Sequence, residues 1–271
     1  MLKYILREKK ELIIVISIIL ICSIALAIGI YAQVTNKTIT KTEEQKQEEN
    51  FQSLKDNFNT LFTNTINKEA SAKLTNANIN YDEIIYTAYD IRETKASKYD
   101  LNAKIPMFKK ETNTTKQINN SIYNTFAQKI INIVNEGTKY TIYNLDYVVY
   151  INENILSLVI KCILKDGNLP QRTIIQTYNY NLDTDKLISL EEAINIKNLD
   201  KENVQSIVNE EIKKVAEQNS DIETIYKRDI EDKMYKVENT QNFFIGKNGY
   251  LYIIYAYGNN NYTSEKDIVI F

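Results

Sequence analysis

The longest apolar segment of the chain is residues 12–32, which contain no charged side chain. A helix rises about 1.5 Å per residue, so roughly 20 residues cross the hydrocarbon core of a bilayer. Four basic side chains precede the segment: Lys3, Arg7, Lys9 and Lys10. Positive flanks stay in the cytoplasm, so the pattern predicts a cytoplasmic tail at 1–11 and a single-pass signal anchor at 12–32. The C-terminal domain is then expected outside the cell membrane.

A cleaved signal peptide is the alternative for this segment. Its apolar region would run about 7 to 15 residues and would end at a small-x-small site. The apolar run here is longer, and Ile30-Tyr31-Ala32 is a poor cleavage site. The sequence therefore favours an anchor that remains in the bilayer.

The next segments are a polar stretch and an amphipathic one. Residues 33–50 have almost no apolar side chains, which indicates a juxtamembrane linker or the exposed start of a helix. From Phe51 to Ile66 apolar side chains recur at steps of three and four, which predicts an amphipathic helix over 51–79. This helix is expected to pack on its own domain. A coiled-coil dimer through residues 41–67 is the alternative, although the pattern covers only two heptads.

Residues 80–137 predict a first α/β unit. Two strands are expected within 81–106, and Pro106 should end the second because proline cannot donate to a strand ladder. A helix follows, ending near Gly137. Its apolar side chains step by four: Ile118, Ile122, Phe126, Ile130 and Val134.

Residues 138–271 predict a second α/β unit that begins with three strands, near 140–151, 154–166 and 172–182. In the second strand, alternate apolar side chains share one face, so Cys162 is expected to be a buried small hydrophobe. A helix should start at Asp200, with Leu199 and Val204 at the spacing of a hydrophobic staple.

The end of this unit predicts more sheet. Asn248-Gly249 lies between two apolar runs, which is a strong hairpin signal. Both alternating faces of 250–257 are apolar or aromatic, as in a central strand covered on both sides. A short strand, KDIVIF, follows. Taken together, the patterns predict an α+β fold, in which a mostly antiparallel sheet packs with helices.

Oxygen-bearing side chains between Asn181 and Glu192 have the spacing of a calcium-binding EF-hand loop. The segment before them has the pattern of a strand rather than a helix, and Lys186 occupies the position where the loop needs glycine. A turn at Asp183-Thr184-Asp185, followed by a capping box of Ser189 and Glu192, explains the same residues. We therefore favour the turn and cap, and expect no metal and no cofactor.

Composition restricts the chemistry further. Lys and Arg number 33 against 35 Asp and Glu, which argues against a nucleic-acid partner. The chain has no histidine, so Ser-His-Asp catalysis, Cys-His catalysis and nearly all zinc hydrolases are excluded. Carboxylate-only mechanisms such as glycoside hydrolysis survive this test. Cys22 lies in the apolar run, so an intrachain disulfide with Cys162 is not expected.

The order of segments resembles a known bacterial pair. ILSLVIKCIL, TYNYNLDTDKLISLEEAI, the capped helix, FFIGKNGYLYIIYAYG and KDIVIF resemble an extracytoplasmic domain of unknown function. KYDLNAKIPMF with NTTKQINNSI resembles the companion domain that often precedes it. The pair occurs in the ectodomain of the lysozyme-sensing anti-sigma-V factor and in the non-catalytic N-terminal part of some peptidoglycan deacetylases. The resemblance covers about residues 80–271. Asn181 replaces a usual Asp, and Asp185 replaces a common Gly.

The resemblance implies an α/β fold at the surface of a Gram-positive cell, and it carries over neither activity. Eleven residues before the anchor are too few to wrap a sigma factor, and a deacetylase needs an added metal domain with histidine ligands. The expected function is therefore a non-catalytic, membrane-anchored binding or sensing protein of the cell envelope. Its ligand would be cell-wall glycan or a protein such as lysozyme.

No catalytic residues are predicted, and the candidate ligand-binding residues are four tyrosines. Tyr250, Tyr252, Tyr255 and Tyr257 form the densest aromatic cluster, and aromatic faces with polar tips suit sugars and protein interfaces. Two alternatives remain. One is a cell-wall hydrolase that uses Glu191-Glu192 or Asp183-Asp185 as paired carboxylates. The other is an envelope scaffold that dimerises through residues 41–67. The oligomeric state is not predicted.

Overall fold

The computed structural model of the 271-residue chain describes residues 42–62, 66–67, 84–219 and 226–271. The chain divides into two compact units, residues 1–54 and 55–271. The described residues of the first unit belong almost entirely to helix α2 (Glu43–Asp56), in which no residue is buried. Thr42 starts this helix, since its hydroxyl accepts the Gln45 N–H and Gln45 Oε1 accepts the Thr42 N–H.

The C-terminal bound of the helix predicted over 51–79 is wrong, whereas the exposed helix start that was one of the two interpretations of 33–50 is observed. Helix α2 begins within the predicted linker and ends at Asp56, and a 3-10 turn η1 (Phe58–Leu61) and strand β1 (Ile66–Asn67) follow it. Tertiary packing overrides the helical period here. The Phe58 side chain is buried with its ring centroid 6.4 Å from that of Phe244, while β1 pairs with a strand of the main sheet. Residues 68–79 lie outside the described residues.

The second unit is built on a large sheet with seven described strands. Six of them pair in the order β2-β3-β4-β5-β6-β7, and β1 pairs with β4. The pairs are antiparallel except β3–β4 and β1–β4. The bounds are β2 (Ile85–Lys95), β3 (Tyr99–Phe108), β4 (Thr141–Asn152), β5 (Ile155–Asp166), β6 (Arg172–Asn181) and β7 (Lys186–Leu187). The α+β class with mostly antiparallel sheet is confirmed.

Strand β3 does not end at Pro106, contrary to the prediction. It continues to Phe108, and Pro106 pairs with Thr87 of β2. The pairing of β3 with β4 stops at Ala103, so Pro106 has a strand on only one side. A register shift between Thr87 and Tyr89 lies opposite it. Proline is tolerated in such a position, because no second neighbour requires its missing N–H.

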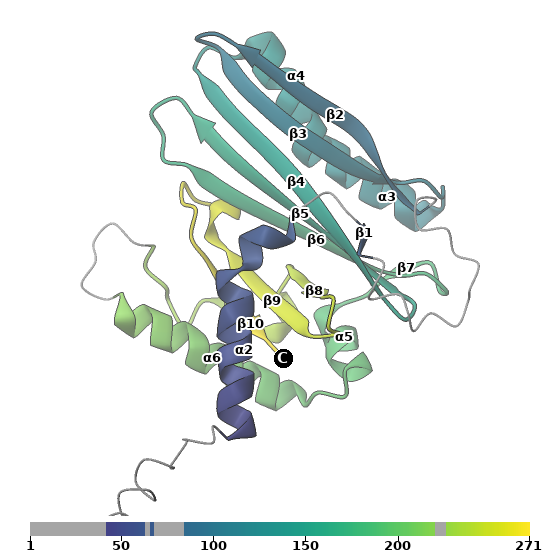
Figure 1. The fold of residues 1–271 in the computed structure, drawn as a ribbon, viewed down its shortest axis with the longest axis vertical. Helices are drawn as coiled ribbons and strands as arrows, with labels where there is room; N and C mark the ends of the chain where they lie inside the picture. Colours follow the sequence, from purple (N-terminus) through teal and green to yellow (C-terminus); the bar gives the residue numbers. More distant parts are fainter. Residues whose placement is uncertain (1–41, 63–65, 68–83, 220–225) are drawn as a thin grey trace, which may run out of the picture. The chain divides into compact units, whose positions relative to one another are not determined.

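One face of the large sheet is covered by the crossover between β3 and β4. This crossover runs through α3 (Asn113–Ile122), a π-helical turn η4 (Tyr123–Ala127) and α4 (Gln128–Glu136), and it lies behind β2 and β3 in Figure 1. Gly137 caps it, as predicted. Four of the five residues predicted to face the core are buried, but Val134 is exposed and Ile133 is buried instead. Residues four apart are about 40° out of line on an α-helix, so a run of such steps moves gradually off the buried face. The π-helical turn compensates for this rotation only once, so Val134 turns outward and Ile133 takes the buried position.

The remaining elements form a second layer. Helices α5 (Leu190–Ile196) and α6 (Lys201–Gln218) precede a small antiparallel sheet of order β10-β9-β8. Its strands are β8 (Phe243–Ile245), β9 (Leu251–Ala256) and β10 (Lys266–Ile270), and short 3-10 turns η5 (Lys233–Tyr235), η6 (Val237–Asn239) and η7 (Tyr257–Asn259) flank it. The predicted Asp200 cap, the hairpin at Gly249 and the central position of β9 are confirmed.

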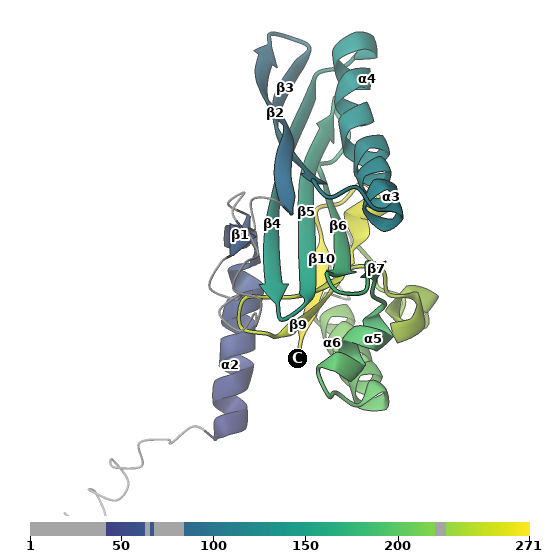
Figure 2. The ribbon, with the colours of Figure 1, turned by 90° about the vertical axis from the view of Figure 1, so that its right-hand side faces the viewer.

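Two apolar cores lie on either side of the large sheet. The first contains the crossover helices and the alternate side chains of β3 to β6, including Cys162, which is fully buried as predicted. The second contains α5, α6 and the small sheet. Figure 2 shows the crossover helices on one face of the sheet and β9, β10 and α6 toward the other. The segments predicted as two units, 80–137 and 138–271, therefore share one sheet and its first core.

Side chains close two sheet edges that would otherwise be open. On β8, Ser157 Oγ accepts the Ile245 N–H and Asn179 Nδ2 donates to the Phe243 carbonyl. On the outer edge of β6, the Asn259 amide pairs with both the N–H and the carbonyl of Ile175. Buried backbone groups need such partners, so these amides replace a missing strand.

No helix within the described residues is both long enough and apolar enough to cross a membrane. The predicted anchor, residues 12–32, lies outside those residues. It remains a prediction from the sequence.

Candidate functional site

Of the four tyrosines predicted to bind a ligand, three lie inside the protein. Tyr252, Tyr255 and Tyr257 are 5%, 2% and 2% exposed, and Tyr250 is partly buried beside them. Strand β9 is the middle strand of the small sheet and is buried along its whole length. The Tyr252 ring stacks on Phe244, and the Tyr255 hydroxyl hydrogen-bonds Thr240. The cluster is therefore part of the folded core, without an open aromatic face.

Tyr257 belongs to a buried polar network. Its hydroxyl donates to the Asp267 carboxylate and lies 2.9 Å from the Tyr235 hydroxyl. Asp267 in turn accepts two hydrogen bonds from the Arg228 guanidinium, at 2.7 and 2.9 Å. Burial, and then the Asp267 charge, raise the pKa of Tyr257 well above its usual value. This network fixes β10 to the segment around Arg228.

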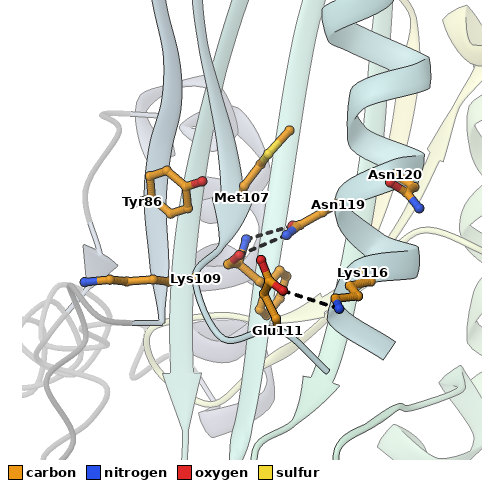
Figure 3. Close-up of a pocket in the computed structure, with 8 residues that line it drawn as sticks. Tyr86, Met107, Lys109, Glu111, Lys116, Asn119 and Asn120 are labelled. Carbon is orange, nitrogen blue, oxygen red and sulfur yellow. Dashed lines mark hydrogen bonds and ion pairs between the residues drawn. The ribbon is translucent and has the colours of Figure 1, made fainter. Parts of the chain in front are cut away.

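The best candidate site is a pocket of about 580 Å³ where β2 and β3 approach helix α3. Figure 3 shows Tyr86 and Lys109 on its strand side and Lys116, Asn119 and Asn120 on its helix side, with Met107 between them. Phe108 and Glu111 complete the lining. The volume lies within the range of about 300–1,000 Å³ that is typical of small-molecule sites.

One amide holds the strand wall of this pocket to its helix wall. Asn119 Oδ1 accepts the Phe108 N–H at 2.8 Å, and Asn119 Nδ2 donates to the Phe108 carbonyl at 2.9 Å. The end of β3 thereby receives, from the helix, the pair of hydrogen bonds that a neighbouring strand would give. Because both bonds come from one side chain, Asn119 fixes the width of the pocket.

The loop between β3 and α3 is held as firmly. Thr112 and Thr115 form a capping box at the start of α3, and the Thr115 hydroxyl also donates to the Lys110 carbonyl at 2.5 Å. Thr112 Oγ1 donates to Asp185 Oδ1 at 2.7 Å, which joins this loop to the turn after β6. The pocket is thus preformed, because its walls and its connecting loop are anchored separately.

The charges in the pocket are mainly positive. Lys116 Nζ lies 3.3 Å from Glu111 Oε2, and both side chains are more than half exposed, so this pair contributes little stability. Lys109 has no charged or hydrogen-bonding side-chain partner among the described residues, and Lys110 follows it in the loop. The lining therefore contains two lysines against one carboxylate, together with the Asn120 amide and the exposed Tyr86 ring. Lys116 is paired with that carboxylate, and the Lys109 side chain points away from the helix wall in Figure 3.

This arrangement is suited to binding. Tyr86 is 44% exposed, and a tyrosine ring presents an apolar face with a polar tip. An ammonium group is a mobile donor for carboxylates, while an amide both donates to and accepts from sugar hydroxyls. The residues that line the pocket thus match a ligand that combines a sugar ring with a carboxylate.

The acidic stretch 181–192 forms the turn and cap that its pattern predicts. Asn181 Oδ1 accepts the N–H groups of Asp183 and Thr184, and Asp185 adopts a positive φ of 57°. Ser189 and Glu192 form the predicted capping box of α5. Within the described ranges, no group of three or more His, Cys, Asp or Glu side chains is placed to hold a metal ion.

The carboxylates considered for hydrolysis are engaged in structural contacts. Glu191 pairs with Lys201, and Asp183 accepts a hydrogen bond from Asn154. Asp185 accepts from the Tyr180 hydroxyl at 2.5 Å and from Thr112, and these two hydrogen bonds lower its pKa. A general acid at neutral pH needs a raised pKa, so Asp185 is unsuited to that role.

Sequence reasoning did not find the pocket. Its residues come from β2, β3, the loop and α3, and none of these segments carries a binding motif by itself. The sequence does contain the capping signal Thr112-x-x-Thr115, which places the start of α3, but the Asn119–Phe108 contact depends on how the helix folds back on the strand.

Comparisons with known proteins give only distant similarity to solved structures. No family model matches the chain, and no curated protein matches it. A solved structure of a DUF3298 family protein from Pseudomonas aeruginosa is similar over 65% of this chain and 82% of that one, with 13% identity and a TM-score of 0.38. A member of the DUF3298 family from Bacteroides fragilis is similar over 52% of this chain and 54% of that one, with 12% identity and a TM-score of 0.28. Both are bacterial proteins of a family whose name denotes a domain of unknown function.

Proposed function

We propose that this protein is a membrane-anchored, extracytoplasmic binding protein of the bacterial cell envelope, and that it binds an acidic fragment of cell-wall glycan in the pocket between Tyr86 and α3. The observation that carries the proposal is the pocket itself. It is preformed, it exposes an aromatic ring, and its lining has a net positive charge, with two lysines against one carboxylate.

The location rests on the sequence. Residues 12–32 have the length and composition of a membrane span, and basic residues precede them. A single-pass protein with this orientation exposes residues 33–271 to the cell wall. The resemblance to the ectodomain of the anti-sigma-V factor and to the N-terminal part of peptidoglycan deacetylases supports the same location, and it points to binding or sensing without catalysis.

The charge of the pocket decides between glycan ligands. A neutral sugar would use Tyr86 and Asn120 but would leave the net positive charge of the lining, two lysines against Glu111, unbalanced. Muropeptides carry carboxylates on the sugar and on the peptide, and they are the acidic glycans at hand in a cell wall. A muropeptide should therefore bind more tightly than a neutral N-acetylglucosamine oligosaccharide of the same length.

The test is isothermal titration of a disaccharide muropeptide into the complete chain, purified in a mild detergent. Lys116→Gln and Tyr86→Leu should each weaken binding about tenfold, since each removes one polar or stacking contact worth roughly 1–1.5 kcal/mol. Lys213→Gln and Tyr262→Leu change an exposed lysine and an exposed tyrosine elsewhere, and they serve as matched controls.

Two results would contradict the proposal. One is equal affinity for the muropeptide and the neutral oligosaccharide. The other is unchanged muropeptide binding in both pocket variants. Titration of lysozyme in the same series identifies a protein ligand, because its binding would persist after the pocket substitutions if it used another surface.

A further inference from the structure

The strand β2 (Ile85–Lys95) forms one margin of the large sheet. Among the described residues it pairs with β3 alone, and it is the outermost strand of the sheet in Figure 1. An unpaired strand edge presents a row of N–H and C=O groups that can hydrogen-bond another strand. At eleven residues, β2 is a long edge.

Two other edges of this fold are closed by side chains. Asn259 occupies the edge of β6, and Ser157 and Asn179 occupy the edge of β8. No side chain from the described residues hydrogen-bonds the backbone of β2 between Tyr89 and Lys95 in this way. Within the part of the chain that the structure describes, β2 is therefore an edge without such a closing side chain.

The side chains of β2 alternate in a way that limits the partner. Ile91 lies opposite Ala103, which is buried in the first core, so Ile91 faces the helices. Asp90 and Arg92 therefore lie on the other face, two positions apart and opposite in charge. A strand that pairs with this edge must present the reverse order of charges.

A second copy of β2 meets that requirement. We propose that two copies of this protein pair β2 with β2, antiparallel, across a two-fold axis through Ile91. Residues directly opposite each other in an antiparallel pair lie on the same face of the sheet, so they must be an even number of positions apart in the β2 sequence. The two-fold axis therefore passes through a residue and not between two residues. With the axis at Ile91, Asp90 lies opposite Arg92 of the second copy and Arg92 opposite Asp90. Axes at Asp90, Arg92 or Glu93 place like charges opposite each other.

The crossover helix adds apolar surface beside this seam. Asn119 bonds Phe108 on β3 and Ser121 bonds Tyr178 on β6, so these two residues lie on opposite flanks of the helix. The residues-per-turn of the α-helical and π-helical segments place Ile131 and Val134 on the same side of the helix as Asn119. This side of the helix faces β2. Both are about two-fifths exposed, at 38% and 43%. A two-fold axis at Ile91 brings this flank of each copy toward the other.

The surface is distinct from the ligand pocket and from residues 41–67. The pocket uses Tyr86 at the start of β2, whereas the pairing is centred on Ile91, beyond the register shift between Thr87 and Tyr89. The pairing of β2 can therefore be tested independently of the proposed ligand.

Cysteine cross-linking tests the register in the complete chain, purified in detergent, with Cys22 replaced by alanine. Opposite Cα atoms in an antiparallel pair lie about 4.5–5.5 Å apart, within disulfide range, so Ile91→Cys should form a covalent dimer under mild oxidation. Thr94→Cys is the matched control on the same edge. Its two copies would be about 20 Å apart in this register and should not cross-link. Equal cross-linking of both variants, or none at Ile91→Cys, overturns the proposal.

Charge exchange provides a second test. Asp90→Arg and Arg92→Asp should each raise the dimer dissociation constant about tenfold in analytical ultracentrifugation, because each places like charges opposite each other twice. The double variant Asp90→Arg/Arg92→Asp restores opposite charges and should recover the original dissociation constant. Two outcomes contradict the pairing. One is a double variant whose dimer dissociation constant is as high as those of the single variants. The other is a wild-type chain that remains monomeric at about 100 µM, a concentration at which even a weak dimer should form.

Discussion

Ser157 Oγ donates a 2.7 Å hydrogen bond to Asn179 Oδ1 within the protein interior, where both side chains are almost completely buried. Each then serves the edge of β8: Ser157 accepts the Ile245 N–H, and Asn179 donates to the Phe243 carbonyl. Two neighbouring strands of the large sheet thus supply the polar groups that the small sheet lacks. The two sheets are joined by directed hydrogen bonds as well as by apolar contact.

Replacing Asn179 should therefore be costly. Asn179→Ala removes the donor to the Phe243 carbonyl and the acceptor of the Ser157 O–H in a buried site, which should lower the free energy of unfolding by about 2–3 kcal/mol. Urea denaturation followed by circular dichroism measures this change. Asn195→Ala, an exposed asparagine on α5, is the control and should change the midpoint little. Equal midpoints for the two variants would show that the Asn179 contacts contribute nothing.

Asp185 should make stability depend on pH. Hydrogen bonds from Tyr180 and Thr112 lower its pKa in the folded protein, below the value of about 3.9 that an unfolded aspartate has. Its stabilising effect is therefore complete above about pH 5 and is lost as the pH falls through the folded pKa. Asp185→Asn keeps the shape and tolerates the positive φ but removes the charge.

The melting temperature of Asp185→Asn should lie below that of the wild type at pH 7, and the difference should shrink towards pH 3. Asp183→Asn, on the same turn, is the control. A difference that stays constant from pH 7 to pH 3 would contradict the role of the Asp185 charge.

Cys162 should be unreactive while the protein is folded. Burial raises the pKa of its thiol to about 12. Because this pKa is about three units above the ordinary value of 9.0, the thiolate fraction at pH 8 is about a thousandfold smaller. A thiol reagent should therefore label Cys162 only in denaturant, as measured in a Cys22→Ala variant. Labelling at the same rate with and without urea would show that this core opens readily.

Two glycines should respond differently to alanine. A Cβ at Gly258 would clash with the carbonyl oxygens of Thr173 and Thr263, so Gly258→Ala should cost about 3 kcal/mol. Gly249 has a φ of +74° but more open surroundings, so Gly249→Ala should cost only about 1–2 kcal/mol. Thermal unfolding of both variants ranks them. The reverse order would mean that backbone strain at the hairpin outweighs the close approach at η7.

Local patterns predicted the parts of the fold that depend on local chemistry. The capping box of Ser189 and Glu192, the Asp200 cap, the hairpin at Gly249 and the buried face of β5 are confirmed because each rests on neighbours in sequence. The errors occur where contacts between residues far apart in the sequence determine the bounds of an element. Phe58 leaves the helical pattern to reach Phe244, and Pro106 is tolerated because β4 has already diverged from β3.

The candidate site was beyond the reach of the sequence for the same reason. The aromatic cluster of β9 suggested an open face, but a central strand between two covered sides has none. The pocket that does form depends on Asn119, which reaches back eleven positions to Phe108. Nothing in the residues from 108 to 119 distinguishes that contact from an ordinary exposed asparagine on a helix.

The first core draws its residues from one continuous stretch of chain, Ile84 to Leu182, whereas most of the second comes from later residues. During synthesis, the large sheet and its crossover can consolidate before β8 has emerged. Ser157 and Asn179 are then already in position when the later strands arrive, so the small sheet assembles on a finished template. We expect the order of translation and the order of folding to coincide in this protein.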